Sequence, residues 1–267
     1  MNLFFRKLGA GPPLIIIHGL YGSSDNWITI GRKLSEKFEV YLIDQRNHGQ
    51  SPHSDEHNYN LLKNDLKEFM DQQSIEKAII IGHSMGGKTA MFFAADYPER
   101  ITSLIVVDIS PISYKTTNSF QLLSHKTIMD SMCSIDFSKI NNRLQLDMLL
   151  SESIPQNHVR QFLLKNIKRT KENTFSWIIN ISTLRKELPR IMDGLEISNF
   201  ENVKSITGFP VLFIKGADSD YILEKDEQAI KMIFPFAEIV TIPNSGHWVH
   251  AEQPELFLQA IEKFIFS

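Results

Sequence analysis

The sequence predicts an α/β fold built on a mainly parallel β-sheet. Six short apolar runs rich in β-branched residues recur along the chain, and stretches with apolar residues three and four positions apart lie between them. Because the runs are apolar throughout rather than alternating, we expect the strands to be covered by helices on both faces of the sheet. The alternation of strand and helix indicates that most strands are parallel.

The predicted elements follow one another regularly except in one region. Strands are expected at residues 14–18, 38–44, 77–82, 101–108, 210–216 and 237–242, and helices at 59–73, 85–98, 224–234 and 254–266. Between about Pro111 and Gly208 we find no convincing strand, only helical patterns at 119–132, 142–150 and 157–170. We therefore predict a core of residues 1–110 and 209–267 that carries a helical cap insertion, residues 111–208.

Charge and composition narrow the classes of partner. The 267-residue chain has 28 Lys and Arg against 31 Asp and Glu, a formal charge of −3, so its overall charge does not predict binding to nucleic acid or to an anionic membrane. No apolar run approaches the ~20 residues of a spanning helix, and no secretory signal pattern opens the chain. We expect a soluble, cytoplasmic protein without stable membrane insertion. The single cysteine, Cys133, has no neighbour that would activate its thiol, so we expect it to be inert.

Residues 78–93, AIIIGHSMGGKTAMFF, match two motifs at once. Residues 82–86 fit G-x-S-x-G, the nucleophile elbow of a serine hydrolase, whereas residues 82–89 fit G-x-x-x-x-G-K-T, a phosphate-binding loop. A phosphate loop normally follows the first strand of its domain, but this motif follows the third, although LIVVD at 104–108 could supply a magnesium ligand. The phosphate loop also leaves the polar segments 18–27, 44–51 and 244–254 unexplained, and a serine hydrolase uses all three. We therefore favour the elbow, in which Lys88 would reach solvent or pair with an acid.

Each step of serine chemistry has a candidate residue. Ser84 can occupy the strained strand-to-helix turn, because the small residues around it leave room for that turn. His247 lies between the last strand and the last helix, where it would accept the serine proton and return it to the leaving group. For the oxyanion hole we expect the backbone N–H groups of Met85, which follows the nucleophile, and of Leu20, which follows an earlier strand.

Two regions offer the acid that would orient His247. Asp108 ends the strand that directly follows the elbow helix, at the sheet edge where the nucleophile is expected. Asp218 and Asp220 lie in the loop after the strand VLFIKG, the commoner position for the acid in such enzymes, but Ser219 occupies the place where it usually falls. We favour Asp108 and keep Asp218 and Asp220 as alternatives.

Several further features have a structural as well as a functional interpretation. HSDEH at 53–57 could bind a metal, but a serine mechanism needs no metal or cofactor, so we predict none. KNIKRTK at 165–171 could bind an anionic part of the substrate, although a solvated helix face explains it better. Arg46 and His48 could border the pocket or hold a loop together. Four apolar residues of the insertion could line an acyl pocket or belong to the core: Phe162, Phe175, Trp177 and Met192.

These motifs resemble the α/β-hydrolase superfamily and, more narrowly, the YbfF-type esterases. HGLYGSSDNW, DQRNHGQS, GHSMGGKTAM, VVDISP and GHWVHAE stand in the order and approximate spacing of that family, whereas the helical insertion resembles it weakly. The resemblance implies a mostly parallel eight-stranded sheet with helices on both faces and a helical cap. It also implies Ser84, His247 and Asp108 as the triad, with Leu20 and Met85 as oxyanion donors.

The function that we predict is that of a carboxylesterase or acyl-thioesterase. It would cleave a small-molecule acyl ester or thioester through an acyl-serine intermediate and without a cofactor. Three alternatives stay open: a phosphate-loop nucleotide binder, a carbon–carbon hydrolase or perhydrolase of the same fold, and a catalytically idle receptor. The sequence predicts neither acyl-chain length nor oligomeric state.

Overall fold

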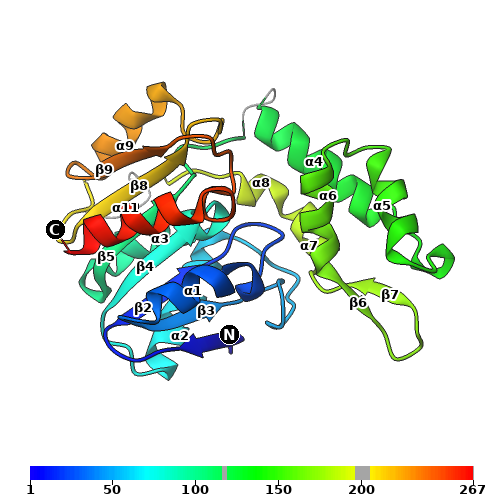
Figure 1. Ribbon diagram of the computed structural model, residues 1–267, viewed down its shortest axis with the longest axis horizontal. Coiled ribbons are helices and arrows are strands. Elements are labelled where there is room, and N and C mark those ends of the chain that lie inside the picture. Colours follow the sequence, from blue (N-terminus) through cyan, green and yellow to red (C-terminus); the bar gives the residue numbers. More distant parts are fainter. Residues whose placement is uncertain (116–118, 196–204, 267) are drawn as a thin grey trace.

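A seven-stranded sheet forms the centre of the computed structural model, which describes residues 1–115, 119–195 and 205–266 (Figure 1). Its strands are β1 (Phe5–Leu8), β2 (Pro13–Ile17), β3 (Glu39–Ile43), β4 (Ala78–His83), β5 (Ile101–Val107), β8 (Val211–Gly216) and β9 (Glu238–Ile242). They lie in the order β1-β3-β2-β4-β5-β8-β9. Only the β1–β3 pair of this sheet is antiparallel, so the carboxyl ends of the other six strands meet at one edge.

The predicted α/β fold and all six predicted strands are confirmed, but the predicted number of eight strands is wrong for the described residues, which form seven in this sheet. The sequence pattern missed β1. Its four residues, FRKL, include two cations and are mostly half-buried at the edge of the sheet, so they do not form the continuous apolar run by which the buried strands were found.

Helices cover both faces of the sheet. They are α1 (Ile28–Leu34), α2 (Tyr59–Gln72), α3 (Met85–Asp96), α9 (Glu227–Ile233), α10 (Val249–Glu252) and α11 (Pro254–Phe266). In β2, Leu14 and Ile16 belong to the same buried cluster as residues of α1 and α11. Ile15 and Ile17 belong to the cluster that contains residues of α2, α3 and α9. Alternate residues thus point to opposite helical layers, which is why the strand is apolar throughout.

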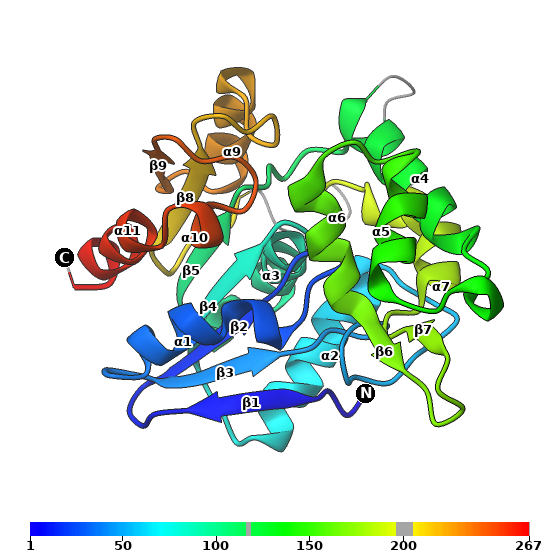
Figure 2. The ribbon, with the colours of Figure 1, turned by 45° about the vertical axis from the view of Figure 1, so that its right-hand side comes forward.

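The chain between β5 and β8 forms a separate group of elements, which Figures 1 and 2 show to one side of the sheet. The group contains α4 (Phe120–Cys133), α5 (Arg143–Ser151), α6 (Asn157–Leu163), β6 (Ile167–Arg169), β7 (Phe175–Trp177), α7 (Ile181–Lys186) and α8 (Leu188–Ile191). The group also contains the short 3₁₀ helices η3 (Phe137–Lys139) and η4 (Leu164–Asn166). The rest of the described chain contains η1 (Ser24–Trp27), η2 (Pro98–Arg100) and η6 (Glu224–Asp226). Parts of the predicted cap range, 116–118 and 196–204, lie outside the described residues.

The antiparallel hairpin β6–β7 corrects the prediction that this region lacks strands and the prediction of a helix over 157–170. The helical pattern is replaced by a strand at Ile167. A polar turn follows, in which Thr170 N donates to Thr174 O at 2.8 Å and Asn173 has φ 62°. Strands of three residues are too short to show the apolar run on which strand prediction depends.

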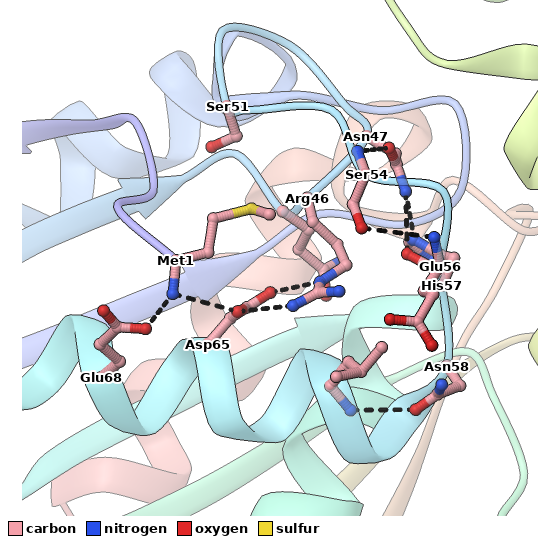
Figure 3. Close-up of polar contacts among 12 residues, drawn as sticks. Met1, Arg46, Asn47, Ser51, Ser54, Glu56, His57, Asn58, Asp65 and Glu68 are labelled. Carbon is pink, nitrogen blue, oxygen red and sulfur yellow. Dashed lines mark hydrogen bonds and ion pairs between the residues drawn. The ribbon is translucent and has the colours of Figure 1, made fainter.

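The loop after β3 is held by polar contacts, as Figure 3 shows. The Arg46 guanidinium donates to both carboxylate oxygens of Asp65 on α2, at 2.6 and 2.8 Å, and both side chains are buried. Asn47 Oδ1 accepts from Ser54 N at 2.8 Å and from Asn180 Nδ2 at 3.1 Å. Of the two interpretations of Arg46, holding the loop is therefore the one that the contacts support, and Asn180 connects this loop to the elements between β5 and β8.

Two findings bear on the predictions from composition. Within the described residues, no helix combines the length and the apolar character that crossing a bilayer would require. The cytoplasmic location stays a prediction. Cys133, the last residue of α4, is exposed.

Candidate active site

Ser84 lies on a sharp turn between β4 and α3. Its backbone has φ 52° and ψ −120°, in the positive-φ half of the map that residues with a side chain rarely adopt. The turn is fixed by its neighbours, since Ser84 N donates to Val107 O of β5 at 2.9 Å and Lys88 N donates to Ser84 O at 3.0 Å. Strain of this kind is typical of functional sites, where the surrounding structure enforces it.

Glycines make the turn possible because other backbone segments pass very close to it. A Cβ at Gly82 would lie 2.4 Å from the Gly86 carbonyl oxygen, and one at Gly86 would lie 2.3 Å from the Ile17 carbonyl oxygen at the end of β2. A Cβ at Gly19 would lie 3.0 Å from the Ser84 Cβ. The segment after β2, which contains the predicted oxyanion donor, therefore packs directly against the serine.

Asp108 lies at the carboxyl end of β5, fully buried and also with a positive φ of 49°. Its Oδ2 is 2.7 Å from His247 Nδ1 and accepts a hydrogen bond from Ser219 Oγ. Its Oδ1 accepts from Gly216 N at 3.0 Å. A buried carboxylate needs such partners, and here the end of β8 and two other loops supply three of them.

The alternative acids are placed differently. Asp218 and Asp220 are exposed residues in the loop after β8, at the wall of the cavity described below. Among the described residues, the acid that is hydrogen-bonded to the His247 ring is Asp108, whose Oδ2 accepts from Nδ1. Ser219, which stands between the two alternatives, instead donates to Asp108.

His247 is surrounded by aromatic and imidazole rings. Its ring stacks on Tyr221 with centroids 3.8 Å apart, and its carbonyl oxygen is 2.8 Å from His83 Nε2. Burial, with smaller effects of nearby histidines, holds the pKa of His83 well below its usual value, and burial lowers the pKa of His125 to about 4 and that of His250 to about 3. These neighbours are therefore neutral near pH 7, and they do not oppose a positive charge on His247.

The segment after β2 is held by a short polar network. His18 Nε2 accepts from Gln45 N at 3.0 Å, which leaves the proton on Nδ1, and that atom is 2.8 Å from the Gly19 carbonyl oxygen. Gln45 Nε2 donates to His18 O at 2.8 Å, and Gln45 Oε1 accepts from Thr89 Oγ1 on α3 at 2.8 Å. The backbone around Leu20 is thus connected to the helix that begins after Ser84.

Ser84, His247 and Leu20 line one cavity of about 690 Å³, which we call the acyl cavity. Much of its remaining wall comes from apolar side chains between β5 and β8, namely Phe120, Leu123, Ile128, Ile154, Val159, Phe162 and Leu163. Met85 lines a much smaller cavity that also touches Ser84 and Leu20. The five residues predicted for the site are therefore grouped at one edge of the sheet. Four of them line the two cavities, and the fifth, Asp108, lies behind His247.

The surroundings of Lys88 differ from those that either interpretation of the motif predicted, a bound phosphate in one and solvent or an acid in the other. It is buried on α3, and its Nζ donates to the carbonyl oxygens of Ile112, at 2.9 Å, and of Asp193. The Tyr114 ring centroid is 4.6 Å from the amine. Burial lowers the pKa of Lys88 to about 7. The expectation that Lys88 reaches solvent or pairs with an acid is wrong, because backbone carbonyls and an aromatic ring surround the amine.

The other candidate groups are dispersed. In the segment 53–57, His53 Nε2 is 2.9 Å from Ile178 O, whereas the buried His57 has its Nε2 3.3 Å from Met85 Sδ. Among the described residues, no three His, Cys, Asp or Glu side chains are grouped as metal ligands. Phe162 lines the acyl cavity, whereas Trp177 donates from Nε1 to Met132 O at 3.0 Å and packs against the core.

Several residues of the site were not foreseen as such from the sequence. The sequence does not indicate that Tyr221 stacks on His247 or that His18 and Gln45 form a network. In both cases the partners are far apart in the chain. Ser219 did give one, since it stands where an acid was expected. A hydroxyl at position 219 can donate a hydrogen bond to an acid at the end of another strand, as Ser219 does to Asp108.

Comparison with known proteins identifies the family. Residues 12–254 match the family model described as the alpha/beta hydrolase fold. This chain belongs to the α/β-hydrolase family. The phosphate-loop interpretation is therefore wrong, and the nucleophile elbow at residues 82–86 is the interpretation that agrees with the family.

The hydrolase is similar to several proteins along nearly its whole length. A solved structure of a marine microorganism esterase is 48% identical, with a TM-score of 0.94 over 98% of this chain and 99% of that one. The sn-1-specific diacylglycerol lipase ABHD11 of Xenopus laevis is 36% identical over 96% of this chain and 80% of the lipase. Esterase YbfF of Escherichia coli K12 is 33% identical over 95% of this chain and 92% of the esterase. The predicted resemblance to YbfF-type esterases is confirmed, and the chain is a hydrolase of the carboxylesterase type.

The close approach at Gly86 can be tested by adding one methyl group. We expect Gly86→Ala to lower the free energy of unfolding by about 2 kcal/mol or more, since the new Cβ would meet backbone that cannot yield easily. Gly31→Ala on α1 is the matched control, because its Cβ would meet the Leu42 side chain at 3.1 Å and no backbone atom that close. Urea denaturation measures both. Equal effects would contradict the steric account of the turn.

The buried amine of Lys88 predicts a specific pH dependence of stability. Its pKa is about 7 in the folded chain and ~10.4 in an unfolded one, so between these values the unfolded chain binds more protons and the free energy of unfolding rises with pH. We expect a smaller rise from about pH 7 to about pH 9 in Lys88→Met, measured by urea denaturation. The exposed Lys171, replaced by Met, should keep the wild-type slope. A wild-type slope in Lys88→Met would contradict the prediction.

Proposed function

We propose that this hydrolase cleaves carboxylic esters or acyl-thioesters through an acyl-serine intermediate, with Ser84 as nucleophile, His247 as general base and acid, and Asp108 as the orienting acid. The observation that carries the proposal is the 2.7 Å contact between His247 Nδ1 and Asp108 Oδ2, beside a serine on a strained turn. Ser84 and His247 also line the same cavity. The names of the esterase and lipase relatives agree with this chemistry.

The reaction takes two steps of the same kind. With Nδ1 directed at Asp108, the His247 Nε2 is the nitrogen that takes the proton from Ser84 as the hydroxyl attacks the acyl carbon. The imidazolium then gives this proton to the leaving alcohol or thiol, which departs. A water molecule attacks the acyl-serine, His247 takes a proton from the water, and the proton returns to Ser84 as the acid product leaves.

The negative oxygen formed in each attack needs hydrogen-bond donors. We assign this role to the N–H groups of Met85, the first residue of α3, and of Leu20, whose segment packs against Ser84 through Gly19. The start of α3 adds a partial positive charge at the same place. One such donor typically contributes about 3 kcal/mol to lowering the barrier.

The substrate class follows from the walls of the acyl cavity. Apolar side chains from α4 and α6 suit the hydrocarbon part of an acyl group. We propose that residues 1–110 and 209–267 form the catalytic core and residues 111–208 the cap that selects this group. In that division the core carries the candidate triad, and the cap supplies much of the apolar wall.

The nucleophile can be tested with a fluorophosphonate probe and p-nitrophenyl acyl esters. We expect the wild type to be labelled and to hydrolyse the esters, and Ser84→Ala to lose labelling and about three powers of ten or more in turnover. Ser124→Ala is the matched control, since Ser124 lines the same cavity, and it should still be labelled. A folded wild type that resists the probe, or an equally labelled Ser84→Ala, would refute the proposal. Labelling without ester turnover would point to another chemistry on the same fold.

The acid can be identified by comparing three conservative variants. We expect Asp108→Asn to lower kcat by about three to four powers of ten, because the amide cannot stabilise the imidazolium or hold its tautomer. Asp218→Asn and Asp220→Asn should stay within a few-fold of the wild type, since both residues are exposed and the His247 ring is hydrogen-bonded to Asp108 instead. A larger loss in either loop variant than in Asp108→Asn would overturn the assignment.

A further inference from the structure

A second cavity, of about 440 Å³, adjoins the acyl cavity, and we call it the second chamber. The two cavities share four lining residues, His158, Phe162, Trp248 and Glu252, so they meet along this wall. The Phe162 and Trp248 rings, with centroids 5.2 Å apart, form the aromatic part of the partition. The second chamber lies between α6 and η4 on one side and α10 on the other, and Figure 2 shows α6 and α10 facing each other.

One helical face supplies the first wall of the chamber. His158, Gln161, Phe162 and Lys165 all line it and are spaced as neighbours on one face of a helix, along α6 and into η4. Gln161 and Lys165 are exposed and offer an amide and an amine. This wall is therefore more polar than the part of α6 that faces the acyl cavity, where Val159 and Leu163 lie.

The opposite wall contains a buried imidazole. His250 is 5% exposed and stacks on Trp27 with centroids 3.9 Å apart. Its Nδ1 is buried and has no hydrogen-bond partner among the residues that the structure describes. Burial, then His247 and Lys165, lowers the pKa of His250 to about 3, so the ring is neutral near pH 7. The His250 ring therefore gives this wall an aromatic surface that carries no charge near pH 7.

The charges around the chamber favour an uncharged ligand over an anion. Lys165 lies on one wall and Glu252 on the other, so the formal charges of these two side chains cancel. Glu252 also accepts from Gly246 N at 2.7 Å and from Trp248 N at 3.2 Å, which holds the loop that carries His247. A phosphate group would meet this carboxylate, whereas hydroxyl groups can both donate to and accept from such walls.

The proposed reaction indicates which part of the substrate would occupy this chamber, namely the leaving group. In acylation the His247 imidazolium protonates the leaving oxygen, so the leaving group must lie on the histidine side of the serine. Trp248, the next residue, forms the partition, and the second chamber begins behind it. We propose, on the basis of the proposed function, that the second chamber binds an uncharged, hydroxylated leaving group, with Gln161 and Lys165 as its hydrogen-bonding residues.

The test compares two esters that share an acyl chain and differ in the leaving group. For 1-monobutyrylglycerol and ethyl butyrate, we expect the wild type to have the higher kcat/KM with the glyceryl ester. Lys165→Met and Gln161→Leu should each lower the ratio of the two kcat/KM values about fivefold, the size of one lost hydrogen bond. Lys168→Met is the matched control, because this exposed lysine of β6 lines neither cavity and should keep the wild-type ratio.

The possible results separate the inference from the proposed function. A wild-type ratio in both Lys165→Met and Gln161→Leu, or an equal loss with the two esters, would overturn the second chamber as the leaving-group site while leaving the serine mechanism intact. A marked preference for the glyceryl ester carrying a phosphate, lost in Lys165→Met, would overturn the uncharged class. Hydrolysis of neither ester by the folded wild type would overturn the proposed function, and the inference with it.

Discussion

The close approach of two backbone segments at the carboxyl edge of the sheet determines the rest of the site. Ile17 of β2 pairs with Gly82 of β4. Beyond this pair, the two backbone segments come so close that Gly86 and Gly19 have no room for a side chain. The turn that results holds Ser84 at a positive φ and places the Leu20 segment against it. Because the strands are parallel, the segments that carry the acid and the histidine reach the same edge.

A buried negative charge is the second constraint, and it organises the loops. Asp108 has no contact with solvent, so its charge must be compensated locally. Gly216, the last residue of β8, and Ser219 of the loop after it do this together with His247 of the loop after β9. The same three hydrogen bonds therefore fix the positions of two loops relative to β5. An acid on the loop after β8 would lie on a more exposed segment, as Asp218 does.

The sequence predicted the parts of the molecule whose signals are local. The buried strands are continuous apolar runs, and the elbow is a five-residue pattern, so both were found. The strand β1 and the hairpin β6–β7 were missed because short, partly exposed strands carry no such run. The partners of Lys88 were missed for a different reason. Its acceptors, Ile112 and Asp193, are 24 and 105 residues away, and a backbone carbonyl has no sequence signature.

Lys88 links the elements that form the wall of the acyl cavity to the helix that begins after Ser84. The two segments that enter and leave the elements between β5 and β8 are paired, since Leu195 N donates to Pro111 O at 2.7 Å and Tyr114 N to Met192 O at 2.8 Å. From its position on α3, one turn after Ser84, Lys88 donates to a carbonyl of each segment.

Moving these elements as one body would therefore break both bonds and leave a buried amine without acceptors, which is costly. Lys88 belongs to the same helix that begins after Ser84, so the two paired segments are fixed relative to this serine. The helices α4 and α6, which line the cavity, belong to the group of elements that these paired segments join to the core. In the proposed function, changes on those helices would alter the choice of acyl group while the geometry at Ser84 stays the same.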